Sequence, residues 1–514
     1  MGISCYFSCE INNILDMTYR SWLQTEEELI EDIETCALAF RILRMHGFDI
    51  SSDSLSHISD GSRFQDSVQG YINDTKTLFE LYKASQIRIL EDEPTLENIA
   101  SWSRKLLQGQ LRSKRVSRPV EYTIKVPYYS ATVEPQEHRR SIEHFNTMSI
   151  QMKKISIPVS FISNSCAFCI KTIAIQRICT RAFSATEDIL ALATEKFHSA
   201  QSIYQQGLQR IGRWMEEVGL HQLKFTRVMP SDLFIFMAAT VFPPESYDAS
   251  IAWIQNSILA TAVDDFFDGG GSIDELRNLI ALIEEWDAHR RIGFCSKNVE
   301  ILFYAIYNTN NQIAAKAELV QSRIVSGHIA ETWVDFVRAL MAEAEWTSRR
   351  YVPTMEDYME VAEVSFALGP IIASSLYLIG QELSEDMIRS LEYKNLLRHA
   401  SISSRLMNDI GTYEKEMSQG YINTVLLRAH RDGVEMSPAS IEAAKTEIRG
   451  LIADSRRELL RLVINEGGSI PRPCRDVFLN TLKITHRFYS EGDGFSLREE
   501  LVDAVKEVVH EPLK

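Results

Sequence analysis

The sequence lacks the basic surplus that nucleic-acid binding requires. Its 54 Lys and Arg residues are outnumbered by 70 Asp and Glu residues, which gives a formal net charge of −16. Such a chain cannot supply the positive charge that replaces counterions along a nucleic-acid backbone. We therefore expect no nucleic-acid partner.

The cysteine spacing offers no disulfide framework. Small secreted domains usually carry an even set at regular spacings, whereas the eight cysteines of this chain are scattered, so we expect a reducing or stroma-like compartment. Cys166 and Cys169 form a lone CxxC without the second pair or the histidines that a zinc site needs. We interpret them as structural thiols.

Long uninterrupted apolar runs are also absent. A fairly apolar stretch, residues 157–175, is broken by Pro158, Asn164 and Lys171, and a spanning helix needs about 20 predominantly apolar residues. We expect no stable membrane insertion. The first seven residues have neither the charged and apolar parts of a signal peptide nor the Ser/Arg-rich composition of a transit peptide, so the sequence shows no route into an organelle.

Helical periodicity is the pattern that the sequence does contain. Apolar side chains follow a helical spacing from Glu10 to about Gln108, for instance at Ile33, Phe40 and Leu43. No strand-like alternation competes with this pattern, and the helical signal strengthens again after about residue 200. Helices joined by short polar loops are typical of α-barrels and solenoids. The sequence therefore predicts an all-α fold.

Three carboxylates end one apolar helical run. Asp264, Asp265 and Asp268 follow the apolar residues 258–263 and precede three glycines, residues 269–271. Like charges one turn apart repel, and the negative end of the helix dipole adds to that cost. Either this is a solvated helix end, or a cation neutralises it. Oxygen ligands without nearby His or Cys favour Mg²⁺ ahead of Ca²⁺.

A second oxygen-rich cluster favours the interpretation that a cation binds here. Asn408, Thr412 and Glu416 are spaced four residues apart, so their side chains form one stripe about 12 Å long on a helix. Two such stripes facing each other could hold several Mg²⁺ ions. Mg²⁺ bound by few protein groups usually completes its shell with substrate phosphate, and metal would also supply the positive charge that this acidic chain lacks.

The two clusters together resemble the motifs of class I terpene synthases. Residues 264–268 match the aspartate-rich DDxxD motif and residues 408–416 match (N/D)Dxx(S/T)xxxE, in the same order. The resemblance covers most of the chain and is strongest to plant ent-kaurene synthases and kaurene synthase-like diterpene synthases. It implies three Mg²⁺ ions and a chloroplast location, with the cytoplasm as the alternative. The metal ligands it implies are Asp264, Asp268, Asn408, Thr412 and Glu416.

The same resemblance implies two helical domains. Residues 1–195 would form a truncated, α-barrel-like N-terminal domain, a relic of a class II domain, and residues 196–514 the class I helical bundle. Residues 32–35 (Asp-Ile-Glu-Thr) stand where class II enzymes have DxDD, and this departure argues against protonation-initiated cyclisation. Residues 153–184 resemble an insertion. By comparison with the family, we expect neither a third helical domain nor a transit peptide in this sequence.

Two arginines are candidates for holding diphosphate. Arg227 matches the first arginine of the family's RxR stretch, but Met229 replaces the second, so a surface salt bridge and a phosphate contact remain equally open. Arg405 lies one turn before Asn408, and the resemblance favours a contact with diphosphate. The alternative is an i,i+4 ion pair with Asp409.

Further pocket residues come from the resemblance. Phe236 matches a pocket aromatic, although aromatics at helical spacing are usually core. Gly369 and Pro370 lie inside an apolar helical stretch, where proline would expose carbonyls that could steady a cation or simply kink the helix. Ile371 matches an isoleucine associated with tetracyclic, kaurane-type products. Residues 487–495 resemble a closing lid or an ordinary surface turn.

The resemblance implies Mg²⁺-dependent ionisation of ent-copalyl diphosphate and cyclisation to ent-kaurene or a related diterpene olefin. Three alternatives remain. A prenyl-elongating transferase would show a second aspartate-rich motif instead of the second cluster. A diterpene or sesquiterpene synthase acting on another prenyl diphosphate would keep both motifs. A catalytically impaired helical binding protein would result if the insertion disrupted the domain junction.

Overall fold

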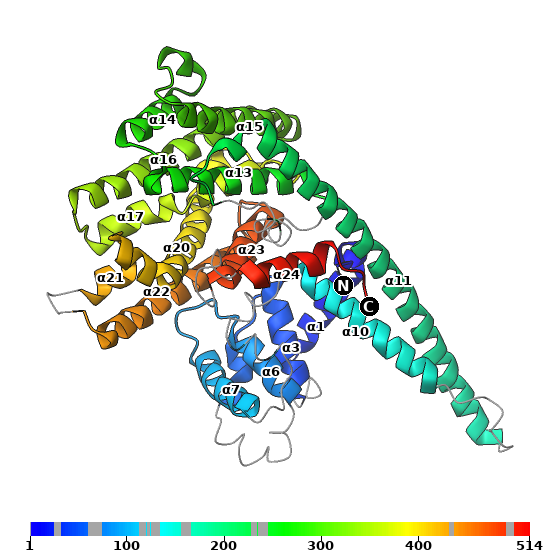
Figure 1. Cartoon of the computed structure of the whole chain (residues 1–514). Coiled ribbons are helices and arrows are strands. Elements are labelled where there is room, and N and C mark those ends of the chain that lie inside the picture. Colours follow the sequence, from blue (N-terminus) through cyan, green and yellow to red (C-terminus); the bar gives the residue numbers. More distant parts are fainter. Residues whose placement is uncertain are drawn as a thin grey trace.

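The computed structural model describes residues 2–24, 32–59, 75–112, 120, 124, 134–155, 166–227, 234, 245–430, 436–489 and 498–514. These residues form helices and their connections, with no strand among them. The expected all-α fold is confirmed (Figure 1).

The first helices build a small core of their own. Helices α3, α6 and α7 pack side by side and bury Phe40, Leu43, Leu81 and Leu96 almost completely, as their helical spacing predicts. The helices of this part are η1 (Ser4–Phe7), α1 (Ser8–Leu23), α3 (Ile33–Met45), η2 (Ser52–Leu55), α4 (Ser56–Ser59), α6 (Thr75–Ser85) and α7 (Pro94–Arg112).

Residues 32–35 lie at the start of α3, where Ile33 packs against that core and Asp32 and Thr35 are exposed. The Thr35 hydroxyl donates a hydrogen bond to the Asp32 carboxylate, and the Glu34 carboxylate pairs with Lys76 at 2.6 Å. Glu34, the third of these four residues, is therefore engaged in an ion pair at the protein surface.

Two long helices lie in the sequence between these first helices and the C-terminal bundle. Helix α10 spans Glu134–Ile155, and α11 spans Cys166–Glu217 and runs along one side of the molecule (Figure 1). Helix α11 continues through the expected domain boundary at 195/196, which stays a prediction. The expected insertion also stays a prediction, because residues 156–165 and the side chains of residues 148–186 lie outside the described part.

The C-terminal end of the chain returns to these two helices. Helix α24 (Arg498–Val509) packs against α10 and α11. The two termini of the chain lie close together (Figure 1). The Arg139 guanidinium is 1% exposed and donates to the carbonyls of Glu507, Glu511 and Pro512 at 2.5, 2.7 and 2.5 Å. The Glu507 carbonyl belongs to the last turn of α24, where helical partners are missing, and the carbonyls of Glu511 and Pro512 follow the end of the helix.

The remaining helices form a bundle around α13. Nearly every side chain of α13 from Ala249 to Val263 is buried, as expected for a helix that is apolar on all sides. Helix α18 packs on α13, and α20 packs on α22 and α23. The bundle consists of η4 (Leu220–Gln222), α13 (Tyr247–Asp265), η5 (Phe266–Gly270), α14 (Ile273–Glu285), η6 (Trp286–Arg291), α15 (Lys297–Gln321), α16 (Ser326–Arg349), α17 (Met355–Ser365), α18 (Leu368–Leu376), α19 (Glu385–Arg389), α20 (Leu391–Gln419), α21 (Thr424–Ala429), α22 (Pro438–Ile464), α23 (Arg472–Tyr489) and α24 (Arg498–Val509).

One described stretch, Met355–Leu376, is long and apolar enough to cross a membrane by length and composition alone, yet 61% of its apolar window is buried inside the protein. It comprises α17 and α18, which separate at Ala367, where φ is +65°. These are core helices of the bundle. The apolar stretch 157–175 noted in the sequence has no described side chains.

Arg44 offers a test of the N-terminal core. Its guanidinium is 1% exposed and bonds to Glu93 at 2.6 Å and to the carbonyls of Ile87 and Ile50. We expect Arg44→Met to lower the free energy of unfolding by about 3 to 5 kcal/mol, because it leaves a buried carboxylate unpaired. Denaturant unfolding followed by circular dichroism measures the loss.

Arg88→Met is the control, since Arg88 pairs with the half-exposed Glu97 at 2.7 Å. An exposed pair contributes about 1 kcal/mol or less. Equal losses in the two variants would contradict the prediction.

Candidate active site

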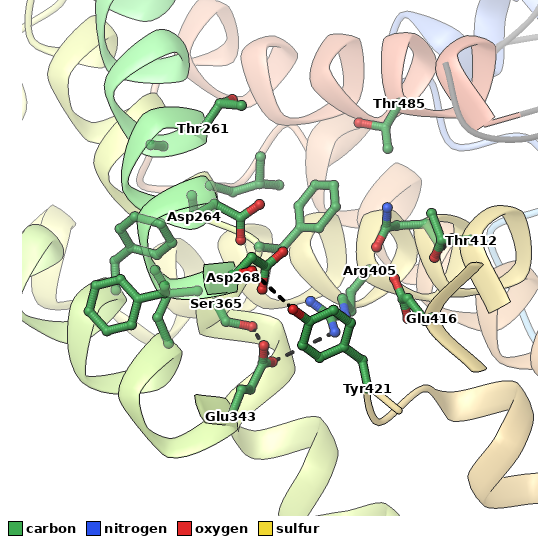
Figure 2. A pocket seen from close by; sticks show the side chains of 18 of the residues that line it. Thr261, Asp264, Asp268, Glu343, Ser365, Arg405, Thr412, Glu416, Tyr421 and Thr485 are labelled. Atoms are coloured by element: carbon green, nitrogen blue, oxygen red, sulfur yellow. Dashed lines mark hydrogen bonds and ion pairs between the residues drawn. The ribbon is translucent and has the colours of Figure 1, made fainter. Parts of the chain in front are cut away.

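One cavity brings the two oxygen-rich clusters together. It has a volume of about 480 Å³ and is walled by α13, α16, α17, α18, α20 and α23, as Figure 2 shows from close by. Of the site residues predicted from the sequence, those that line it are Arg227, Asp264, Asp268, Ile371, Arg405, Asn408, Thr412 and Glu416.

The end of α13 supplies the first set of carboxylates, which we call the first arm (Asp264 and Asp268). The helix continues as the wider turn η5, in which Asp268 leaves helical geometry and Gly269 takes a φ of +118°. Only glycine adopts such a φ without strain. Both arm carboxylates face the cavity, whereas the Asp265 carboxylate accepts a hydrogen bond from the backbone N–H of Arg227 at 2.8 Å.

Helix α20 supplies the second arm (Asn408, Thr412 and Glu416) from across the cavity (Figure 2). Asp409 does not line the cavity and is fully buried. Its carboxylate accepts hydrogen bonds from the Tyr358 hydroxyl at 3.2 Å and from the backbone N–H of Thr424 at 3.0 Å.

The cavity encloses more negative charge than it neutralises. Burial raises the pKa of Asp264, and burial with the neighbouring Asp264 carboxylate raises the pKa of Asp268 to about 7. Burial also raises the pKa values of Glu343 and Glu416. Each of these carboxylates is therefore less stable in its charged form than in water, and a bound cation would relieve that cost.

The donor chemistry fits Mg²⁺. The two arms offer carboxylate, amide and hydroxyl oxygens, the ligand set of a hard cation. Among the described residues, no group of three His, Cys, Asp or Glu side chains converges closely enough to hold an ion alone. The acidic ligands are instead divided between facing walls, so an ion here would complete its shell from a bound anion and water.

Both arginines lie at the cavity and in ion pairs. Arg227 pairs with Asp264 at 2.9 Å and with Asp265 at 3.1 Å. Arg405 pairs with Asp409 at 2.9 Å, so the expected i,i+4 pair exists, while its guanidinium also lines the cavity. Contact of either arginine with diphosphate stays a prediction.

Sequence reasoning missed several residues of the site. Glu343 on α16 faces the cavity, accepts a hydrogen bond from Ser365 at 2.6 Å and lies 3.7 Å from Arg405 (Figure 2). Its neighbours alternate acidic and alanine residues, a pattern that resembles a solvated helix face. Tyr358 and Tyr421 were missed too, because no motif marks them.

Three predicted features differ in the structure or lie outside the described residues. The break that was expected at Gly369–Pro370 occurs at Ala367, and Pro370 lies in the first turn of α18, where its missing N–H has no helical partner to lose. Phe236 lies outside the described residues. So do residues 490–495 of the expected lid, although Phe488 and Tyr489 at the end of α23 line the cavity.

Comparison with known proteins agrees with this geometry. A family model described as the terpene synthase N-terminal domain matches residues 1–126, and one described as the metal binding domain of the terpene synthase family matches residues 216–458. The chain belongs to the terpene synthase family. The second match includes both arms.

Named relatives of this terpene synthase chain come from plants. Dolabradiene synthase from Zea mays is 49% identical over 522 residues, covering 100% of this chain and 58% of the relative. Ent-kaur-16-ene synthase from Oryza sativa is 46% identical, covering 100% of this chain and 65% of the relative. The chain thus spans less than two thirds of the length of these curated relatives. The solved structure of abietadiene synthase from Abies grandis is 26% identical with a TM-score of 0.81, covering 100% of this chain and 66% of that one.

The raised pKa of Asp268, about 7, makes metal binding depend on pH. Protons and Mg²⁺ compete for a carboxylate, so the affinity for Mg²⁺ should fall as the pH drops through about 7, by up to about tenfold per pH unit. Calorimetric titration of Mg²⁺ into the metal-free protein between about pH 8 and about pH 6 measures this. An affinity that stays constant over the range would contradict it. In Asp268→Asn, the remaining affinity should depend less steeply on pH over this range, because only the other carboxylates of the cavity can then compete for protons.

Proposed function

We propose that this chain is a class I diterpene synthase. In this proposal it ionises ent-copalyl diphosphate, releases diphosphate and cyclises the cation to ent-kaurene or a related labdane-derived olefin. The observation that carries the proposal is the placing of two oxygen-rich arms on facing walls of one cavity. A helical binding protein would have no use for so costly an arrangement of buried carboxylates.

The proposed reaction depends on positive charge that stabilises the leaving diphosphate more than on acid–base groups. Bound between the arms, Mg²⁺ would act as a Lewis acid that stabilises the diphosphate leaving group. Asp264 and Asp268 would hold it from α13, and Asn408, Thr412 and Glu416 from α20. The guanidinium groups of Arg227 and Arg405, at the same cavity, would bind the departing anion, because arginine matches phosphate geometry.

The walls away from the arms suit a hydrocarbon cation. Their apolar side chains would disfavour water, which would otherwise quench the cation, and aromatic faces attract positive charge. The cavity volume of about 480 Å³ falls within the range of ligand pockets. The apolar lining includes Trp253, Phe336, Leu340, Phe366, Leu368, Ile371 and Phe488.

The choice of ent-copalyl diphosphate and of a kaurane-type product has two sources of support. It rests on Ile371, which is 8% exposed and lines the cavity, and on the relative named ent-kaur-16-ene synthase. The relative named dolabradiene synthase favours a different diterpene product as the alternative. Both names include the word chloroplastic, which supports a plastid location.

A side-by-side product assay tests the substrate. Purified protein with Mg²⁺ is given ent-, normal and syn-copalyl diphosphate, geranylgeranyl diphosphate and farnesyl diphosphate, and the products are analysed by gas chromatography. We expect a hydrocarbon from ent-copalyl diphosphate. Turnover of another substrate only would overturn the substrate assignment, and absence of diphosphate release from all of them would favour a binding protein.

Ile371 is the residue we expect to control the product. A threonine hydroxyl at this cavity wall would place a dipole beside the tricyclic cation and favour its early loss of a proton. Ile371→Thr should therefore shift the product from a tetracyclic to a tricyclic diterpene, measured as the ratio of the two peaks. Ile372→Val is the control, since Ile372 is fully buried but does not line the cavity. An unchanged ratio in Ile371→Thr would contradict the role.

A further inference from the structure

The connection between α20 and α21 touches both arms. Helix α20 ends at Gly420, whose φ is +78°, a conformation that glycine adopts without strain. Tyr421 and Ile422 follow, and Asn423 is the N-cap of α21. We call residues Gly420–Asn423 the arm connection.

Asn423 holds the last ligand of the second arm. It is fully buried, and its side-chain Nδ2 donates to the Glu416 carboxylate at 2.8 Å and to the carbonyl of Asp409 at 2.9 Å. Its Oδ1 accepts the capping bond from the backbone N–H of Val425 at 2.8 Å. Because the cap requires an acceptor, the amide group must turn its NH₂ toward Glu416.

Tyr421 reaches the other wall. Its hydroxyl donates to the backbone carbonyl of Asp268 at 3.1 Å, across 153 positions of sequence, as the dashed line in Figure 2 shows. That carbonyl belongs to η5, where Asp268 and Gly269 have left helical geometry. The side chain of Tyr421 also lines the cavity.

We propose that Tyr421 and Asn423 are positioning residues that set the geometry of the two arms before metal binds. The arms carry like charges and would relax apart if nothing joined them. Tyr421 ties the backbone of the first arm to the arm connection, and Asn423 fixes the Glu416 carboxylate of the second arm to the same connection. Ligands held in place in this way lose less freedom when an ion binds, which raises affinity.

The inference rests on the proposed magnesium and diphosphate chemistry, but not on the identity of the prenyl substrate. It can therefore be tested by binding. The probe is Mg²⁺ titrated calorimetrically into protein that contains excess inorganic diphosphate, at fixed pH. The rise in melting temperature caused by the same additions is a second readout.

Tyr421→Phe removes only the hydroxyl. We expect its Mg²⁺ affinity to fall by about tenfold or more, the usual effect of removing a group that orients a metal ligand. Tyr413→Phe is the matched control. Tyr413 lies on α20, donates to exposed Glu414 at 2.7 Å and does not line the cavity, so its loss should leave the affinity unchanged.

Asn423→Ser separates positioning from capping. Serine is as good an N-cap as asparagine, but its short side chain cannot reach Glu416 as well. We expect the melting temperature of the metal-free variant to change little and its Mg²⁺ affinity to fall by about 10- to 100-fold. Asn423→Asp also keeps the cap, but places a carboxylate against Glu416, so it should bind Mg²⁺ more weakly than the wild type as well.

The outcomes distinguish failure of the positioning role from failure of the proposed function. If the wild type binds Mg²⁺ with diphosphate and Tyr421→Phe and Asn423→Ser bind it equally well, the positioning role is wrong and the proposed function stands. An unchanged Mg²⁺ affinity in Asn423→Ser would overturn the positioning role of Asn423, whatever the melting temperature of the metal-free protein. If the wild type itself binds no Mg²⁺, the proposed function and this inference are both overturned.

Discussion

Negative charge enclosed in a low-dielectric cavity is the constraint on which the C-terminal half of the chain depends. Asp264, Asp268, Glu343 and Glu416 all face one hollow, and burial raises the pKa of each. Desolvated carboxylates repel each other strongly. A fold retains such a cluster only where the surrounding helices hold it in place, and its stability then depends on the cations that enter.

The bundle provides that support through a buried polar network behind the second arm. Arg405 pairs with Asp409 at 2.9 Å, the Tyr358 hydroxyl donates to the same Asp409 carboxylate, and Asp409 in turn accepts from the start of α21. This network fixes the rotation of α20, because a fully buried carboxylate cannot turn toward the cavity without losing its partners. The adjoining face of α20, which carries Asn408, Thr412 and Glu416, thereby keeps its orientation toward the cavity.

The sequence was most informative where the pattern was local. Helical spacing alone placed Asn408, Thr412 and Glu416 on one face of α20, and the acidic residues before Gly269 marked the end of α13. The break between α17 and α18 was placed two residues too late, because proline tolerates the first turn of a helix as well as a kink. Glu343 was missed because an acidic residue on an amphipathic helix usually faces solvent.

By itself the sequence determined the helical fold, the oxygen-bearing side chains of the two arms and their order along each helix, since these follow from spacings within a few turns. Only the tertiary structure decided that the two arms face one cavity, that Asp265 and Asp409 turn away from it, and that Tyr421 reaches Asp268. Those contacts join residues on different helices, up to 153 positions apart. Such pairs depend on how the helices pack against each other, and the periodicity within one helix does not reveal that packing.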